Sequence, residues 1–209
     1  SGLGKSALLE YWQRLIDPHQ VLLISVRCYR QDHTPLRLLN VLVQQLVRLL
    51  VELTDEFWID PVRRHSRQIG RTFPQITQLV PSSRNDEPLK SLGPDNAAAR
   101  RDASLEGVRE LLAELSQHRP LTIVVDDAQW ADSDSLDALC TWFQPNNDRQ
   151  HGLVVFAVEQ DGDSDVEPFS LSCSSTLSQH IVMQPLADDA GRQLLRRMSE
   201  QTGIKPSPA

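Results

Sequence analysis

The hydrophobic residues of this chain form short continuous runs that alternate with longer, helically spaced stripes. The continuous runs predict strands buried in a parallel sheet, and they lie at 21–27, 121–126, 153–158 and 180–184. Apolar residues at three- and four-residue spacing predict amphipathic helices over 5–16, 35–50, 103–118, 134–143 and 188–202. Strands that alternate with helices are typical of an α/β domain.

The region 54–104 has a weaker pattern, with scattered apolar residues among polar ones. The stretch Pro81–Asp102 is rich in Ser, Asn, Asp, Pro and Gly, which predicts a mobile loop. A basic cluster precedes it, made of Arg63, Arg64, His65, Arg67 and Arg71. Such a cluster could touch phosphate or a partner, but a solvated helix face is the favoured interpretation.

The first six residues, Ser1-Gly2-Leu3-Gly4-Lys5-Ser6, match the end of the phosphate-binding loop G-x-x-x-x-G-K-[ST]. The first Gly of that pattern would precede Ser1, so we expect a domain that is partial at both ends and whose first strand is missing. The backbone of Gly2, Leu3, Gly4, Lys5, Ser6 and Ala7 would surround the phosphates at a helix N-terminus. Lys5 would bind the β- and γ-phosphates, and the Ser6 hydroxyl would ligate Mg²⁺. The alternative is a small-residue turn before a helix.

A second motif, 121–127, is an apolar strand that ends in two carboxylates, Asp126 and Asp127. Parallel strands bring such residues to the carboxyl edge of a sheet, where ligands bind. Asp126 is then a Mg²⁺ ligand together with Ser6, and Asp127 orients and deprotonates the attacking water. The alternative is a buried strand followed by an Asp-rich turn. Both motifs in one chain favour a nucleotide site that holds ATP or ADP with Mg²⁺.

Composition narrows the class of protein. The 209 residues are 40% hydrophobic and 23% charged, as in an ordinary globular domain. A net charge of −7 argues against non-specific binding to nucleic acid or an anionic membrane. Cys28, Cys140 and Cys173 are far apart, which favours a reducing, cytoplasmic compartment. The stripe at 36–53 is interrupted by polar residues and is not a membrane span. The six histidines are dispersed, so no metal–histidine site or nucleophilic triad is predicted.

The residues Asp126–Asp132 read Asp-Asp-Ala-Gln-Trp-Ala-Asp. This resembles the signature of the signal-transducing ATPases with numerous domains, an AAA-like group. That group occurs in large bacterial transcription regulators, in some adenylate cyclases and beside serine/threonine protein kinase domains. Other elements are similar to the kinase-linked subgroup, namely Arg27-Cys28-Tyr29 with Thr34-Pro35, Phe73-Pro74 and Pro185-Leu186.

The resemblance implies a P-loop three-layer α/β/α sandwich with strand order 5-1-4-3-2. The runs at 21–27, 121–126, 153–158 and 180–184 would be strands 2 to 5, with strand 1 before Ser1 and a lid after Ala209. The region 54–104 would be a family insertion. In the family a polar sensor residue, commonly Arg, follows strand 4. Here Glu159-Gln160 stands in that place, which predicts poor sensing of the γ-phosphate and little preference for ATP over ADP.

Two classes of function stay open. The first is an ATP-hydrolysing regulatory switch in a multidomain signalling protein, whose partners are nucleotide, other domains of the parent chain and, on ATP binding, further copies of itself. The second is a nucleotide-binding scaffold with little turnover, which the missing sensor Arg favours. A small-molecule kinase is a third class, against which the Asp126–Asp132 signature argues. Trp130 and Trp142 are interpreted as packing residues.

Overall fold

The centre of the fold is a parallel sheet of three strands in the order β1-β2-β3. A computed structural model describes residues 4–30, 34–80, 97–143, 151–159, 179, 181–184, 190 and 193. The strands are β1 (Leu22–Arg27), β2 (Leu121–Asp126) and β3 (Gly152–Phe156). Leu22 pairs with Leu121, and Leu121 pairs in turn with Gly152. This confirms the predicted α/β class and the order 4-3-2 of the three strands.

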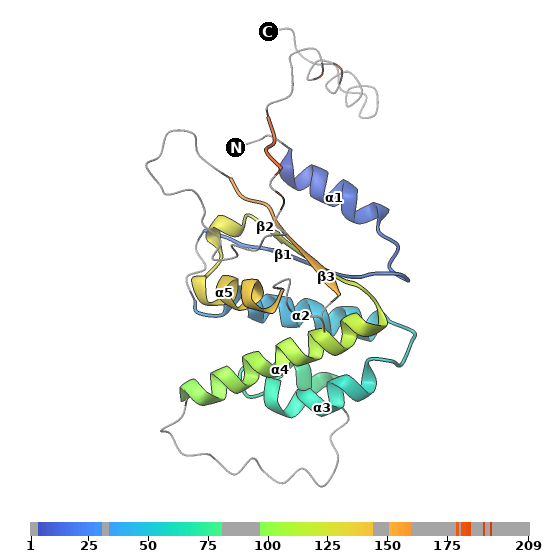
Figure 1. Ribbon diagram of the computed structural model, residues 1–209, viewed down its shortest axis with the longest axis vertical. Coiled ribbons are helices and arrows are strands. Elements are labelled where there is room, and N and C mark those ends of the chain that lie inside the picture. The colour runs from blue at the N-terminus through green and yellow to red at the C-terminus, as the bar shows by residue number, and fades with distance from the viewer. Residues whose placement is uncertain are drawn as a thin grey trace.

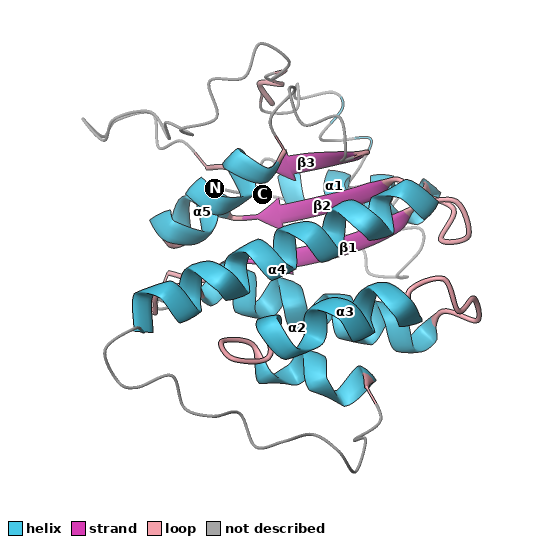
Figure 2. Ribbon diagram, turned by 60° about the horizontal axis from the view of Figure 1, so that its bottom comes forward, coloured by secondary structure: helices cyan, strands magenta, loops and turns pink. Residues whose placement is uncertain are grey.

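Helices lie on both sides of this sheet (Figure 1). Helix α1 lies on one side, α2 and α4 lie on the other, and α3 packs against α4 away from the sheet (Figure 2). The α-helices are α1 (Lys5–Leu15), α2 (Arg37–Glu52), α3 (Ile59–Ile69), α4 (Ala97–His118) and α5 (Ser133–Trp142), and the 3-10 turns are η1 (Pro74–Leu79) and η3 (Ala128–Trp130).

The core forms between the sheet and α2, α3 and α4. β2 is the central strand, and its apolar residues are fully buried, as its continuous run predicts. Helix α2 buries one stripe, made of Leu38, Leu39, Leu42, Val43, Leu46, Val47 and Leu50. Helices α3 and α4 pack closely at Gly107, where a Cβ atom would lie 3.0 Å from Cγ1 of Ile69. This packing gives the middle of the region 54–104 an ordered helical structure.

The basic cluster lies on and beside α3. Arg63 and Arg67 are exposed, Arg63 pairs with Asp60, and Arg64 pairs with Glu114 of α4 at 2.6 Å. His65 is less exposed and contacts the same Glu114 at 3.0 Å. The cluster is therefore mainly a solvated helix face, as favoured from the sequence.

Three sequence predictions about the strands and helices are wrong in detail. The run at 21–27 was predicted to be covered on both faces, but β1 alternates, with Leu22, Ile24 and Val26 buried and Ser25 exposed, because α2 covers one face. Residues 181–184 form no strand, and Ile181 and Val182 are 80% and 83% exposed. In the predicted order that segment pairs with strand 1, not with any of the three described strands. Helix α4 begins at Ala97 instead of Ala103, because three consecutive alanines favour helix.

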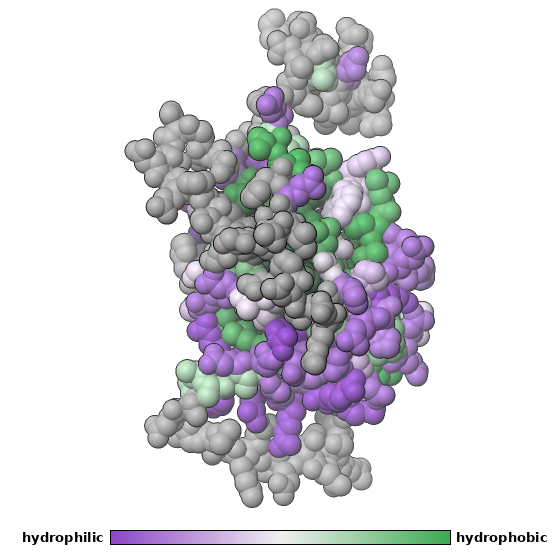
Figure 3. Space-filling model, viewed as in Figure 1, coloured by the Kyte–Doolittle hydropathy of each residue, from purple (hydrophilic) through white to green (hydrophobic). Residues whose placement is uncertain are grey.

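Helix α1 forms where predicted, but its apolar stripe is only partly covered. None of its residues is buried, and Leu8, Tyr11 and Leu15 are more than half exposed. Hydrophobic surface accordingly gathers over α1 in Figure 3. Among the described residues, no helix has the length and hydropathy required to cross a bilayer. Pro185-Leu186 and almost all of the helix predicted over 188–202 lie outside the described residues.

Candidate functional site

The start of α1 and the end of β2 meet at the carboxyl edge of the sheet. The Ser6 hydroxyl donates a hydrogen bond of 2.8 Å to Oδ2 of Asp126, across 120 residues of sequence. Lys5, the first residue of α1, lies directly beside Ser6 and is likewise partly buried, whereas Ala7 is exposed. The structure therefore brings the two sequence motifs into direct contact.

Gly4 sets the entry into α1. It adopts the left-handed conformation, with φ of 82°, and its carbonyl accepts the first helical bond from the N–H of Leu8 at 2.9 Å. A Cβ atom at Gly4 would meet nothing within 4 Å, so the glycine is required by the backbone conformation and not by crowding. The first N–H groups of α1 have no acceptor within the helix and point beyond its N-terminus, where they can bind phosphate. The predicted phosphate ligands Gly2 and Leu3 lie outside the described residues.

The pair formed by Ser6 and Asp126 suits a hard cation. A hydroxyl and a carboxylate oxygen are Mg²⁺ ligands, and Mg²⁺ commonly takes its other ligands from phosphates and water. Within the described part of the chain, no group of three or more His, Cys, Asp or Glu could hold a metal by itself. The oxygens of Ser6 and Asp126 therefore fit Mg²⁺ that is bound together with a nucleotide, rather than a metal site made of protein ligands alone.

Asp127 follows in a strained backbone conformation. Its φ of 54° is left-handed, which is uncommon for a residue other than Gly. Its N–H donates to Oδ1 of Asp126 at 3.1 Å. The turn gives the two consecutive carboxylates different side-chain hydrogen-bond partners, Ser6 for Asp126 and Arg27 for Asp127, although Arg27 also lies 4.0 Å from Asp126. Separate partners are compatible with separate roles, namely metal binding and action on water.

Arg27 is a site residue that the sequence reasoning did not assign. It is the last residue of β1, in register with Asp126. Its Nη2 and Nε lie 2.9 Å and 3.0 Å from Oδ2 of Asp127. The hydrogen bond and the charge of Asp127 raise the pKa of Arg27 above its usual value. The available signal was a charged residue that ends an apolar run, since parallel strands end at one edge.

The turn after β2 is also joined to the end of β3. The N–H of Ala128 donates to the carbonyl of Ala157, and the N–H of Ala157 donates to that of Val125, both at 2.9 Å. The side-chain oxygen of Gln129 accepts from the N–H of Glu159 at 3.1 Å. Glu159 is thus held beside the turn that carries Asp127. Its predicted companion Gln160 lies outside the described residues.

Asp132, the last residue of the signature, joins two helix N-termini. Its carboxylate accepts from the N–H of Ser135 in α5 at 3.0 Å, and from the N–H groups of Leu36 and Leu38 at 3.0 and 3.1 Å. Leu36 has a left-handed φ of 59°, and α2 begins after it, at Arg37 instead of the predicted Pro35. One carboxylate therefore fixes the start of α2 to the turn after β2.

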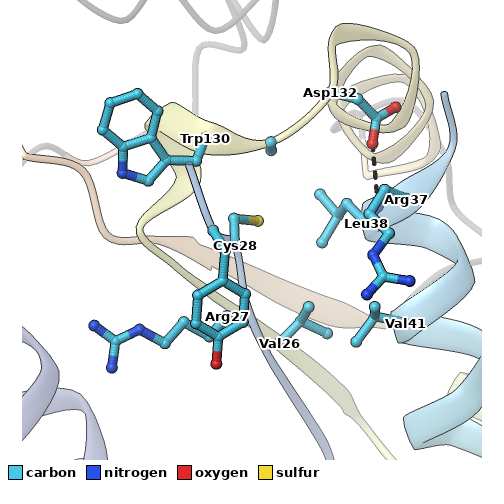
Figure 4. A pocket seen from close by; sticks show the side chains of 10 residues that line it. Val26, Arg27, Cys28, Arg37, Leu38, Val41, Trp130 and Asp132 are labelled. Atoms are coloured by element: carbon cyan, nitrogen blue, oxygen red, sulfur yellow. Dashed lines mark hydrogen bonds between the residues drawn. The ribbon is translucent and has the colours of Figure 1, made fainter. Parts of the chain in front are cut away.

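A shallow hollow lies between the end of β1, the start of α2 and η3 (Figure 4). It is lined by Val26, Arg27, Cys28, Tyr29, Arg37, Leu38, Val41, Trp130, Ala131 and Asp132. Trp130 is 38% exposed, and the guanidinium carbon of Arg30 lies 5.2 Å from its ring centroid. Trp130 is therefore only partly packed, whereas Trp142, 4% exposed, is a core residue as predicted.

The cysteines differ from one another. Cys28 is a buried residue directly after β1, whereas Cys140 of α5 is disulfide-bonded. A disulfide was not anticipated when a reducing compartment was predicted, so that compartment stays a prediction.

A family model described as "AAA ATPase domain" matches residues 1–156. No curated protein matches the chain, and no solved structure does. The matched residues include both motifs and all three strands of the sheet.

Proposed function

Because the chain belongs to the AAA ATPase domain family, we propose that it binds ATP and ADP with Mg²⁺ and hydrolyses ATP as a regulatory switch. The observation that carries the proposal is the contact between Ser6 and Asp126, with Lys5 beside it. A hydroxyl, a carboxylate and an ammonium group at a helix N-terminus are what a Mg²⁺–triphosphate complex requires. When bound, Mg²⁺ would neutralise part of the phosphate charge.

Each residue of the site has a proposed role. Lys5 attracts the β- and γ-phosphates, and the backbone of Gly2, Leu3, Gly4, Lys5, Ser6 and Ala7 surrounds them. Ser6 and Asp126 hold the metal. Asp127 orients the attacking water and accepts its proton. For this role the Asp127 carboxylate must separate from Arg27, whose Nη2 lies 2.9 Å away.

A direct test is equilibrium titration of the full chain with ATP and with ADP, with Mg²⁺ and with a chelator. The affinity for ATP should depend on Mg²⁺ more strongly than the affinity for ADP, because the metal offsets the extra charge of the terminal phosphate. A single-turnover assay then measures hydrolysis. Absence of binding to either nucleotide would refute the proposal.

A nucleotide-binding scaffold with little hydrolysis is the second candidate. Two observations favour it. Glu159 follows β3, in the region where the family that the Asp126–Asp132 signature resembles carries a sensor, and the proposed base Asp127 is already paired with Arg27. Tight binding of ATP without turnover, in an assay where a known ATPase is active, would support this candidate over the first.

The wider setting is part of the proposal. We place the domain in a cytoplasmic signalling protein, of the kinase-linked or transcription-regulator type that the Asp126–Asp132 signature resembles. There it would act on other domains of the same chain, and copies would associate when ATP binds. Light scattering with ADP and with the β,γ-imido analogue of ATP tests the association, since a switch changes its assembly with the nucleotide and a scaffold does not.

A further inference from the structure

Arg27 places a cation among the acidic groups of the candidate site. Its Nη2 and Nε both approach one oxygen, Oδ2 of Asp127, at 2.9 and 3.0 Å. The same Nε lies 4.0 Å from Oδ2 of Asp126, the oxygen that accepts the hydrogen bond from Ser6. The guanidinium is therefore adjacent to the pair of residues that fits Mg²⁺.

Carboxylates and cations meet at this edge of the sheet. The residues that end or follow the three strands include the acidic Asp126, Asp127 and Glu159, and the basic Arg27. Ser6 and Asp126 would hold a metal that offsets phosphate charge, so a phosphate bound with that metal would lie near Asp126. Glu159 would repel that phosphate, whereas Arg27 would attract it.

The present partner of Arg27 can be exchanged. The Arg27 side chain is 54% exposed, and an ion pair open to solvent contributes little net stability. The planar guanidinium offers several donors, and it binds phosphate oxygens in pairs better than an ammonium does. A terminal phosphate can thus compete with Asp127 for the same donors.

From this geometry we infer that Arg27 recognises the terminal phosphate of the nucleotide and sets the preference for ATP over ADP. The inference rests on the proposed function. The end of β1 would then sense the γ-phosphate. In the family that the Asp126–Asp132 signature resembles, this role belongs to a residue after the strand that corresponds to β3, where this chain has Glu159-Gln160. ADP lacks the phosphate in question, so Arg27 contributes to the affinity for triphosphate alone.

The test compares two nucleotides on four proteins. Calorimetry with Mg²⁺ measures the Kd of ADP and of the β,γ-imido analogue of ATP for wild type, Arg27→Gln, Arg27→Lys and Arg63→Gln. Arg63 is a matched control, since it is an exposed arginine of α3 that pairs with Asp60 of the same helix. Wild type should prefer the triphosphate by about tenfold, the value of one charge-assisted contact. Arg27→Gln should lose this preference by weakening the triphosphate alone, Arg27→Lys should keep part of it, and Arg63→Gln should resemble wild type.

The outcomes separate the inference from the proposed function. An equal loss of both nucleotides in Arg27→Gln would show a merely structural role, and an unchanged ratio would show that Arg27 acts only on Asp127; either result overturns the inference while nucleotide binding stands. Failure of wild type to bind either nucleotide refutes the proposed function and the inference together. Thermal unfolding of each variant without nucleotide verifies that it folds as wild type does.

Discussion

The Ser6 hydroxyl lies 2.8 Å from Oδ2 of Asp126 and joins the first helix to the central strand. Lys5 and Asp127, the chain neighbours of these two residues, are therefore held around one point. If Mg²⁺ binds there, the oxygens of Ser6 and Asp126 would ligate the metal instead of forming this hydrogen bond. Loss of either should then have an effect that depends on Mg²⁺.

Asp126→Asn should weaken ATP binding about tenfold or more when Mg²⁺ is present, because a neutral amide oxygen is a poorer ligand than a carboxylate. With a chelator, variant and wild type should bind alike. Calorimetry under both conditions measures the difference. Asp137→Asn is the control, since Asp137 is an exposed residue of α5. A loss that is the same with and without Mg²⁺ would contradict the assignment of Asp126 as a ligand.

Lys5→Ala should weaken Mg·ATP binding by roughly ten- to a hundredfold, the value of a charge-assisted contact. Lys5 begins α1, where its charge adds to that of the helix N-terminus. The control is Arg14→Ala at the other end of the same helix, whose side chain is 79% exposed. An affinity that does not change in Lys5→Ala would place the phosphates elsewhere.

Asp127→Asn should keep ATP affinity while hydrolysis falls about a hundredfold or more, since the amide cannot accept the proton of the attacking water. Single-turnover assays measure the rate and calorimetry the affinity. If affinity falls as far as the rate, Asp127 is mainly a metal ligand. If wild type itself does not hydrolyse ATP, the scaffold is the better description.

The fold followed from the sequence where apolar runs act locally. β2 is buried on both faces and was predicted closely, since its run is continuous. β1 has a similar run, yet only one of its faces is buried, because α2 covers that face alone. The arrangement of the helices decides which faces of a strand are covered. A run of apolar residues alone does not predict that arrangement.

The site was predicted in part for the same reason. Lys5, Ser6, Asp126 and Asp127 belong to local motifs with fixed spacing. The pairing of Arg27 with Asp127 spans 100 residues and depends on the register of β1 and β2. The start of α2 likewise depends on Asp132, which is 96 residues from Leu36. The partners in such contacts are set by tertiary structure, so the residues of one segment can mark a position such as Arg27 at a strand end but cannot name its partner.

Asp132→Ala should destabilise the domain by about 2–4 kcal/mol. It removes the acceptor for three backbone N–H groups, those of Leu36, Leu38 and Ser135. Loss of a helix cap alone costs about 1 kcal/mol, and each further unpaired N–H adds to it. The midpoint of thermal unfolding should fall by on the order of 10 °C in a domain of this size.

Two further variants test whether the hydrogen bonds of Asp132 cause the loss of stability. Asp132→Asn keeps one amide oxygen as an acceptor, so it should lose less stability than Asp132→Ala. Asp134→Ala should change the free energy of unfolding by about 1 kcal/mol or less, because Asp134 is exposed and its partner Arg101 lies at the surface. Circular dichroism melts of the three variants give the order. Equal stability of Asp132→Ala and wild type would show that α2 and α5 start independently of this carboxylate.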